Sequence, residues 1–135
     1  MTYLVDVNVL SEAIKPTPEP KVIEWLRCNE SELVINPIIL GEIRLGIDLL
    51  PAGRRRERLE RWFDEGALKL TCLPIEAATG MRWAQLLARL RSSGILLPVK
   101  DSLIAATALR HGLTVATRNI RDFQRAGAKV FDPFA

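Results

Sequence analysis

Short apolar runs alternate with longer helical patterns along this chain of 135 residues, and the alternation strongly restricts the fold. Apolar runs too short for a helix and bounded by turn residues are typical of buried strands, whereas apolar residues recurring every three or four positions indicate helices. Strands that alternate with helices favour a parallel sheet covered by helices. We predict strands at 3–5, 33–35, 113–116 and 129–131, with a further strand or an extended connection at 68–73.

The intervals between these runs carry helical patterns. Asn36 followed by Pro37 is typical of a helix start, with the asparagine as cap and the proline in the first position. The length suits one domain, and no linker divides the chain. We therefore expect residues 1–135 to form a single α/β domain, a three-layer α/β/α sandwich with a short, mainly parallel sheet. The predicted helices are 7–13, 22–28, 36–50, 54–65, 76–92 (with Met81 on its apolar face), 101–111 and 120–125.

Composition excludes several classes of protein. The formal net charge of +3 permits a nucleic-acid partner without establishing one. Cys28 and Cys72 are isolated, and we expect both to be buried as small apolar residues in a reducing environment. Residues 1–10 lack the basic start of a signal peptide, and no apolar run approaches the ~20 residues of a membrane span. We expect a soluble, cytoplasmic protein without a membrane contact.

The first candidate site residue is Asp6, which directly follows the predicted strand 3–5. Ligand sites in open α/β sheets lie beyond the carboxyl ends of strands, so a carboxylate here favours a site. Asn8 follows two positions later and strengthens that interpretation. Asp6 is equally suited to capping the helix that follows it, and the sequence leaves both roles open.

A second acid, Glu42, lies within the predicted helix 36–50. Its neighbours at helical spacing include Ile38, Leu45 and Leu49, which places the carboxylate in an apolar stripe. A charge on an inward face is costly unless it is paired or bound to a metal. We favour a functional carboxylate, with a salt bridge from the edge of the stripe to a distant arginine as the alternative.

Three further polar residues stand where strands and helices meet. Asp101 opens the helix 101–111, either as its cap or as a site residue looking over the sheet edge. Asn119 and Asp122 follow the strand 113–116, at the sheet edge where Asp6 is expected. Both are ordinary turn and cap residues, so the structural alternative stays open for them as well.

Carboxylates gathered at one sheet edge raise one another's pKa unless a cation neutralises them. Oxygen ligands select Mg²⁺ or Mn²⁺ over zinc. Such a site suits phosphodiester hydrolysis, because the metal lowers the pKa of a bound water and a carboxylate accepts its proton. The single histidine and the scattered glycines support neither a Ser-His-Asp triad nor a phosphate-binding loop.

In its motifs the sequence resembles the PIN-domain nucleases, and within them the VapC-type toxins of bacterial toxin–antitoxin pairs. The motifs occur in the family's order and spacing and span essentially the whole chain. They are LVDVNVLSE at 4–12, GEIRLG at 41–46, DSLIAATA at 101–108 and LTVATRNIRDF at 113–123.

The resemblance implies that Asp6, Glu42 and Asp101 are the acidic metal-site residues of a Mg²⁺- or Mn²⁺-dependent endoribonuclease. A fourth acid of the family often follows the Thr-Arg pair of the penultimate strand, and here Asn119 stands in that place. Either Asn119 substitutes for this acid or Asp122 takes its place one turn later. The sequence leaves open whether the site holds one metal ion or two. The resemblance further implies a homodimer and inhibition by a small antitoxin, through which alone the protein reaches operator DNA.

Several basic residues and auxiliary polar groups complete the expected site. Thr117 and Asn8 are candidates for positioning the water or the metal. Arg44, Arg118 and Arg121 flank the proposed site and are candidate contacts for RNA phosphates. The denser arginine cluster at 54–61 is interleaved with glutamates and is as consistent with a solvated helix face as with an RNA-binding patch.

Two alternatives to a ribonuclease toxin remain from the sequence. One is a catalytically silent PIN-like binding module, which the asparagine at position 119 permits. The other is a phosphatase with Asp6 as nucleophile, as in haloacid-dehalogenase-like enzymes. Against the phosphatase, the residue two positions after Asp6 is Asn8 rather than an aspartate, and no later paired-aspartate motif follows.

Overall fold

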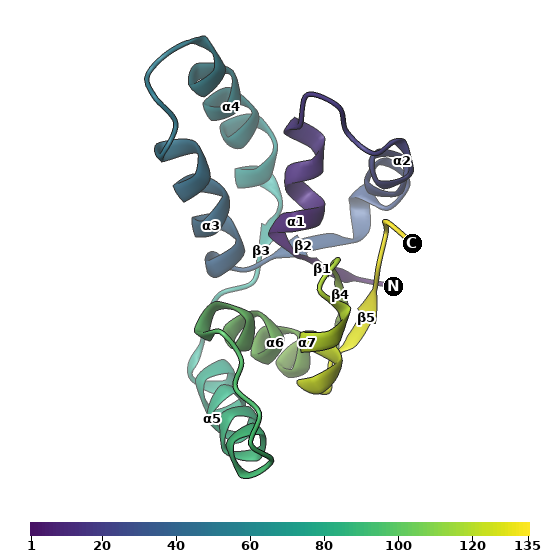
Figure 1. Ribbon diagram of the computed structural model, residues 1–135, viewed down its shortest axis with the longest axis vertical. Helices are drawn as coiled ribbons and strands as arrows, with labels where there is room; N and C mark the ends of the chain where they lie inside the picture. Colours follow the sequence, from purple (N-terminus) through teal and green to yellow (C-terminus); the bar gives the residue numbers. More distant parts are fainter.

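The computed structural model describes all residues from Met1 to Ala135 and shows one α/β fold (Figure 1). Strands and helices alternate along the chain, as the sequence predicts. The strands are β1 (Tyr3–Val5), β2 (Leu33–Ile35), β3 (Thr71–Cys72), β4 (Thr114–Ala116) and β5 (Lys129–Phe131). The helices are α1 (Val7–Leu10), α2 (Pro20–Cys28), α3 (Pro37–Asp48), α4 (Arg54–Glu65), α5 (Ala77–Ser92), α6 (Val99–His111) and α7 (Ile120–Arg125), with 3₁₀ turns η1 (Ser11–Ile14), η2 (Glu30–Glu32) and η3 (Ala67–Lys69).

The five strands form one sheet in the order β3-β2-β1-β4-β5, and every pair of neighbours is parallel. The expectation of a mainly parallel sheet is confirmed. From β1 the chain first adds strands on one side and then returns to add β4 and β5 on the other. The carboxyl ends of β1 and β4 therefore flank the point where the strand order reverses, which is the usual position of ligand sites in open α/β sheets.

Helices cover both faces of the sheet, as Figure 1 shows, with α1–α4 on one side and α5–α7 on the other. This arrangement follows from right-handed crossovers, because connections that travel in opposite directions along a parallel sheet lie on opposite faces. Buried apolar residues of both helix layers and of the sheet form one core cluster. The three-layer sandwich is confirmed.

One fully buried polar residue ties together the two helices that carry candidate acids. The Asn36 side chain accepts a hydrogen bond from the backbone N–H of Ile39 at 2.9 Å and so caps α3, as expected. Its amide also donates to Thr107 Oγ1 on α6 at 3.0 Å. Asn36 therefore fixes the helix of Glu42 against the helix of Asp101.

The structure corrects the expected surroundings of three residues. Cys28 and Cys72 are exposed rather than buried, because they lie at the end of α2 and in the edge strand β3. Met81 is 70% exposed, since α5 turns its buried face, with Leu86 and Leu90, toward the core.

No helix is both long and apolar enough to cross a membrane.

Candidate active site

Asp6 lies directly after β1, where it caps α1 and also contacts a residue that follows β4. It is 6% exposed, and its backbone N–H donates to the Ala116 carbonyl across the sheet at 2.9 Å. One carboxylate oxygen accepts from the N–H of Val7 at 2.8 Å and caps α1. The other accepts from the Thr117 hydroxyl, also at 2.8 Å. Burial raises the pKa of Asp6, although these hydrogen bonds oppose the shift.

Asn8 and Thr117 hold the segments after β1 and β4 together at this point. The Asn8 amide donates to Asp6 Oδ2 at 3.3 Å, and its carbonyl oxygen accepts from the backbone N–H of Arg118 at 3.1 Å. Thr117 is fully buried and follows β4 directly. Together they fix the direction of the Asp6 carboxylate.

Asp101 does not cap its helix. Helix α6 begins at Val99 with Pro98 in the cap position, so Asp101 lies inside the first turn. Its side chain is free to face the other acids. The pKa of Asp101 is raised to about 6, first by burial and then by the negative charges of Asp6, Glu42 and Asp122. The four carboxylates come from four different segments and are near enough for the other three to act on Asp101, and we call them the carboxylate cluster.

Glu42 belongs to the cluster for a different reason from the one we expected. The buried face of α3 is formed by Ile39, Ile43 and Ile47. The stripe that contains Glu42 faces outward, since Leu45 and Leu49 are 56% and 76% exposed. The inward position predicted for Glu42 is therefore wrong. Its side chain is 22% exposed and pairs with Lys100 at 3.4 Å, so the alternative of a salt bridge is found, with a lysine in place of the expected arginine.

Asn119 and Asp122 act as a pair after β4. The Asn119 amide donates to Asp122 Oδ2 at 3.1 Å, and the Asn119 backbone N–H donates to Thr117 Oγ1 at 3.0 Å. Asp122 lies in the first turn of α7, and its negative charge contributes to the raised pKa of Asp101. Asn119 thus holds the Asp122 carboxylate, whose charge acts on Asp101.

The donor set fits a hard divalent cation. The cluster offers carboxylate, amide and hydroxyl oxygens. The pKa of Asp101 is raised by burial and by three neighbouring negative charges, which a bound cation would offset. With the side chains as they stand, no three carboxylates converge to ligand distances around one point. Asp6, Asp101 and Glu42 would have to close in through side-chain rotation to hold an ion.

The three expected arginines differ in their availability. Arg44 bonds Asp48 at 2.9 Å and Glu60 at 3.0 Å, which ties α3 to α4 and argues against a phosphate contact by its guanidinium. Arg118 stacks over the Phe134 ring at 4.2 Å. Arg121 is exposed on α7 and makes no side-chain hydrogen bond or ion pair.

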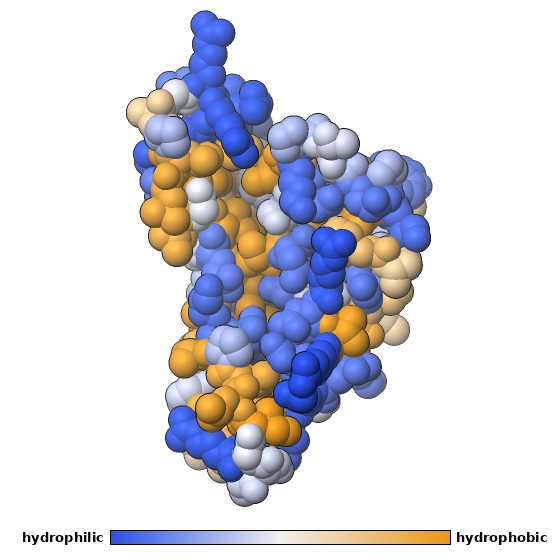
Figure 2. Space-filling view, in the orientation of Figure 1, coloured by the Kyte–Doolittle hydropathy of each residue, from blue (hydrophilic) through white to orange (hydrophobic).

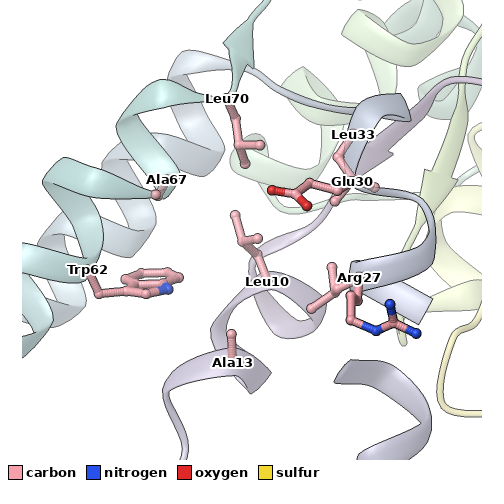
Figure 3. Close-up of a pocket in the computed structure, with 10 residues that line it drawn as sticks. Leu10, Ala13, Arg27, Glu30, Leu33, Trp62, Ala67 and Leu70 are labelled. Carbon is pink, nitrogen blue, oxygen red and sulfur yellow. The ribbon is translucent and has the colours of Figure 1, made fainter. Parts of the chain in front are cut away.

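Two features were absent from the sequence-based site. Lys100 reaches Glu42, and the available signal was its position directly before Asp101. The second is an apolar groove of about 250 Å³ in which Trp62 of α4 faces Leu10 and Ala13 across the opening (Figure 3). It adjoins a hollow of about 360 Å³ beside Arg55 and Arg58, so basic side chains border the groove. The groove had no local signal, because distant segments build it.

Replacing Asp101 with asparagine should stabilise the metal-free protein at neutral pH. A folded-state pKa near 6, above the ordinary 3.8, means that the folded protein binds this proton more tightly. Stability therefore falls as pH rises from about 4 through 6. After allowance for solvent screening we expect a gain of ~1 kcal/mol, or about 3 °C in melting temperature, at pH 7.5 in EDTA.

The measurement is thermal unfolding at pH 4 and pH 7.5, with the gain expected only at the higher pH. Asp64→Asn removes an exposed carboxylate of α4 and serves as the matched control. A pH-independent difference between Asp101→Asn and the wild type would contradict the assigned charge cluster.

Comparison with known proteins identifies the class that this fold and site define. The family model described as "PIN domain" matches residues 3–129. The chain belongs to the PIN domain family. It is 35% identical to the toxin FitB of Neisseria gonorrhoeae, with 97% of each chain covered. It is 33% identical to the VapC ribonuclease Y4jK of Sinorhizobium fredii, covering 97% of this chain and 96% of that one.

A solved structure extends the likeness to three dimensions. FitAB bound to an IR36 DNA fragment contains a chain that superposes with a TM-score of 0.93 at 32% identity, covering 99% of this chain and 96% of that one. The resemblance to PIN-domain proteins of the VapC type is therefore confirmed.

Proposed function

We propose that this protein is a divalent-metal-dependent endoribonuclease that acts as the toxin of a toxin–antitoxin pair. One observation carries the proposal: four carboxylates from separate segments lie near the point where the strand order reverses, and burial together with the charges of the other three raises the pKa of Asp101 to about 6. The relatives named toxin FitB and VapC ribonuclease support the substrate and the biological role. No structural observation favours the silent binding module or the phosphatase.

Asp6, Asp101 and Glu42 are the residues that would hold Mg²⁺ or Mn²⁺. When bound, the cation lowers the pKa of a water and offsets negative charge that develops on the phosphate. Thr117 and Asn8 keep the Asp6 carboxylate in a fixed direction. A carboxylate of the cluster accepts the proton of the attacking water. Asp122, oriented by Asn119, is our candidate for the fourth site position.

An antitoxin is the proposed partner, and the apolar groove is its proposed binding site. The similar solved structure is named as FitAB bound to an IR36 DNA fragment, which supports a protein partner and an assembly that contacts DNA. Apolar grooves of this kind receive the apolar face of a partner helix. The arginines beside the groove suit a segment that also carries acidic residues. The groove lining is Leu10, Ala13, Leu26, Arg27, Glu30, Leu33, Trp62, Gly66, Ala67 and Leu70.

A homodimer is the proposed assembly. Figure 2 shows hydrophobic residues on the surface over α3, where Leu45 and Leu49 are exposed. Contiguous exposed apolar side chains are uncommon on monomers and are typical of interfaces. Both lie away from the buried face of α3, so a second copy can cover them without disturbing the core.

The test of the proposed activity is RNA cleavage by the purified protein, free of its partner. Cleavage should require Mg²⁺ or Mn²⁺, stop on addition of EDTA, and fall strongly in Glu42→Gln and Asp101→Asn. Sequencing of RNA 5′ ends after induction of the protein would identify the target. Activity that persists in EDTA and in both variants would refute the proposal.

A further inference from the structure

Basic side chains near the carboxylate cluster are mostly engaged elsewhere. Arg44 is held by Asp48 and Glu60, and Arg118 lies over an aromatic ring. Arg121 makes no side-chain hydrogen bond or ion pair, whereas Lys100 reaches one of the four carboxylates. Its ammonium makes one polar contact, with Glu42 Oε2 at 3.4 Å, and its side chain is 63% exposed.

Lys100 lies at the solvent-exposed edge of the carboxylate cluster. It belongs to the first turn of α6, directly before Asp101, and it reaches across to α3. There it lines a shallow hollow with Glu42, Gly41 and Leu45. Its positive charge is close enough to lower the pKa of both Asp6 and Asp101, although burial outweighs this effect in each case.

The pair with Glu42 is suited to opening. Exposed ion pairs at such a distance add little to stability, so separating this one costs little. A lysine ammonium is a mobile point charge on a flexible stem and can follow an anion that arrives nearby. The phosphodiester groups of RNA are such anions. Four carboxylates repel a phosphodiester, so its approach requires a positive charge nearby.

We propose that Lys100 is a positioning residue that leaves Glu42 and binds an RNA phosphate beside the carboxylate cluster. This inference rests on the proposed ribonuclease function and adds a residue to it. This contact holds the RNA backbone beside the carboxylates. When the Lys100 ammonium leaves Glu42, the Glu42 carboxylate is free to turn toward a cation. The alternative, which we call the fixed tie, is that the Lys100–Glu42 ion pair stays closed, holds α3 against α6 and never contacts RNA.

Binding of a labelled single-stranded RNA to the full-length protein in EDTA tests the contact without cleavage. Lys100→Met should weaken binding about three- to tenfold and make the slope of log K against log [KCl] less negative by about 0.7, the value for one lost phosphate contact on a single strand. Lys100→Arg keeps the positive charge and should show the wild-type affinity and the wild-type salt slope. Lys129→Met makes the same charge change at the opposite, amino-terminal end of a strand and should match the wild type.

Cleavage kinetics provide the second measurement. A contact made equally in the ground state and the transition state raises KM and leaves kcat nearly unchanged. An unchanged salt slope in Lys100→Met, with a lower melting temperature, would overturn the proposal in favour of the fixed tie. Failure of the wild type to cleave RNA with Mg²⁺ or Mn²⁺ would count against the ribonuclease function alone, because the binding measurement does not depend on cleavage.

Discussion

Replacing Asp6 with asparagine is expected to reduce RNA cleavage about a hundredfold to a thousandfold while leaving the fold intact. Losses of this size follow the removal of one electrostatic group from an active site. The structure explains why the fold survives. Asparagine caps helices as well as aspartate does, so its side-chain oxygen can keep the bond to the N–H of Val7. The Thr117 hydroxyl can turn to accept from the new amide, and the longer bond from the Asn8 amide at 3.3 Å is the one that is lost.

This substitution separates the two roles of Asp6, because it keeps the cap and removes the charge. The measurements are initial rates of RNA cleavage with Mn²⁺ and thermal unfolding in EDTA. Asp64→Asn, on the exposed surface of α4, should cleave at the wild-type rate. A variant that retains the cap, melts like the wild type and still cleaves at a comparable rate would leave Asp6 with a structural role only.

Placing an arginine at position 13 is expected to weaken antitoxin binding about a hundredfold while leaving RNA cleavage unchanged. Ala13 lines both the apolar groove and the adjoining basic hollow, and its methyl group is exposed. A long charged side chain there would block the groove and oppose the basic border with a like charge. Substitutions at the centre of an interface commonly cost ~2 kcal/mol or more, which is about thirtyfold or greater.

The experiment compares the affinity of purified wild-type and Ala13→Arg proteins for the proposed antitoxin. Growth of cells that express both proteins is a second readout, since an uninhibited toxin should arrest them. Ala84→Arg introduces the same side chain on an exposed position of α5, on the other face of the sheet, and should bind normally. Equal affinities for all three proteins would place the partner on another surface.

The local sequence carried enough information for the secondary structure and the class of fold. Short apolar runs, proline and asparagine at helix starts, and glycine at helix ends are local signals, and each acts through a few neighbouring residues. The cap at Asn36 and the helix start at Pro37 are both found where predicted. The rule that crossovers are right-handed then restricts how such elements can be arranged.

Tertiary packing decided the orientation of the helices, which single-helix patterns leave ambiguous. Helix α3 has one apolar stripe through Ile39 and Ile43 and another through Leu45 and Leu49, and only the first is buried. The sequence placed Glu42 on the buried face because either stripe satisfies helical spacing. Cys28 and Cys72 were misplaced for the same reason, since exposure depends on what packs against a residue rather than on its own polarity.

By itself, then, the sequence determined the α/β alternation and the acids that follow the strands, because both depend on residue types at short spacing. Only the tertiary structure decided that Asp6 both caps α1 and faces Thr117, that Asp122 joins the cluster through Asn119, and that Lys100 reaches Glu42. Those relations join residues far apart in the chain. They arise when the carboxyl ends of β1 and β4 are brought side by side in the sheet, and no local pattern encodes them.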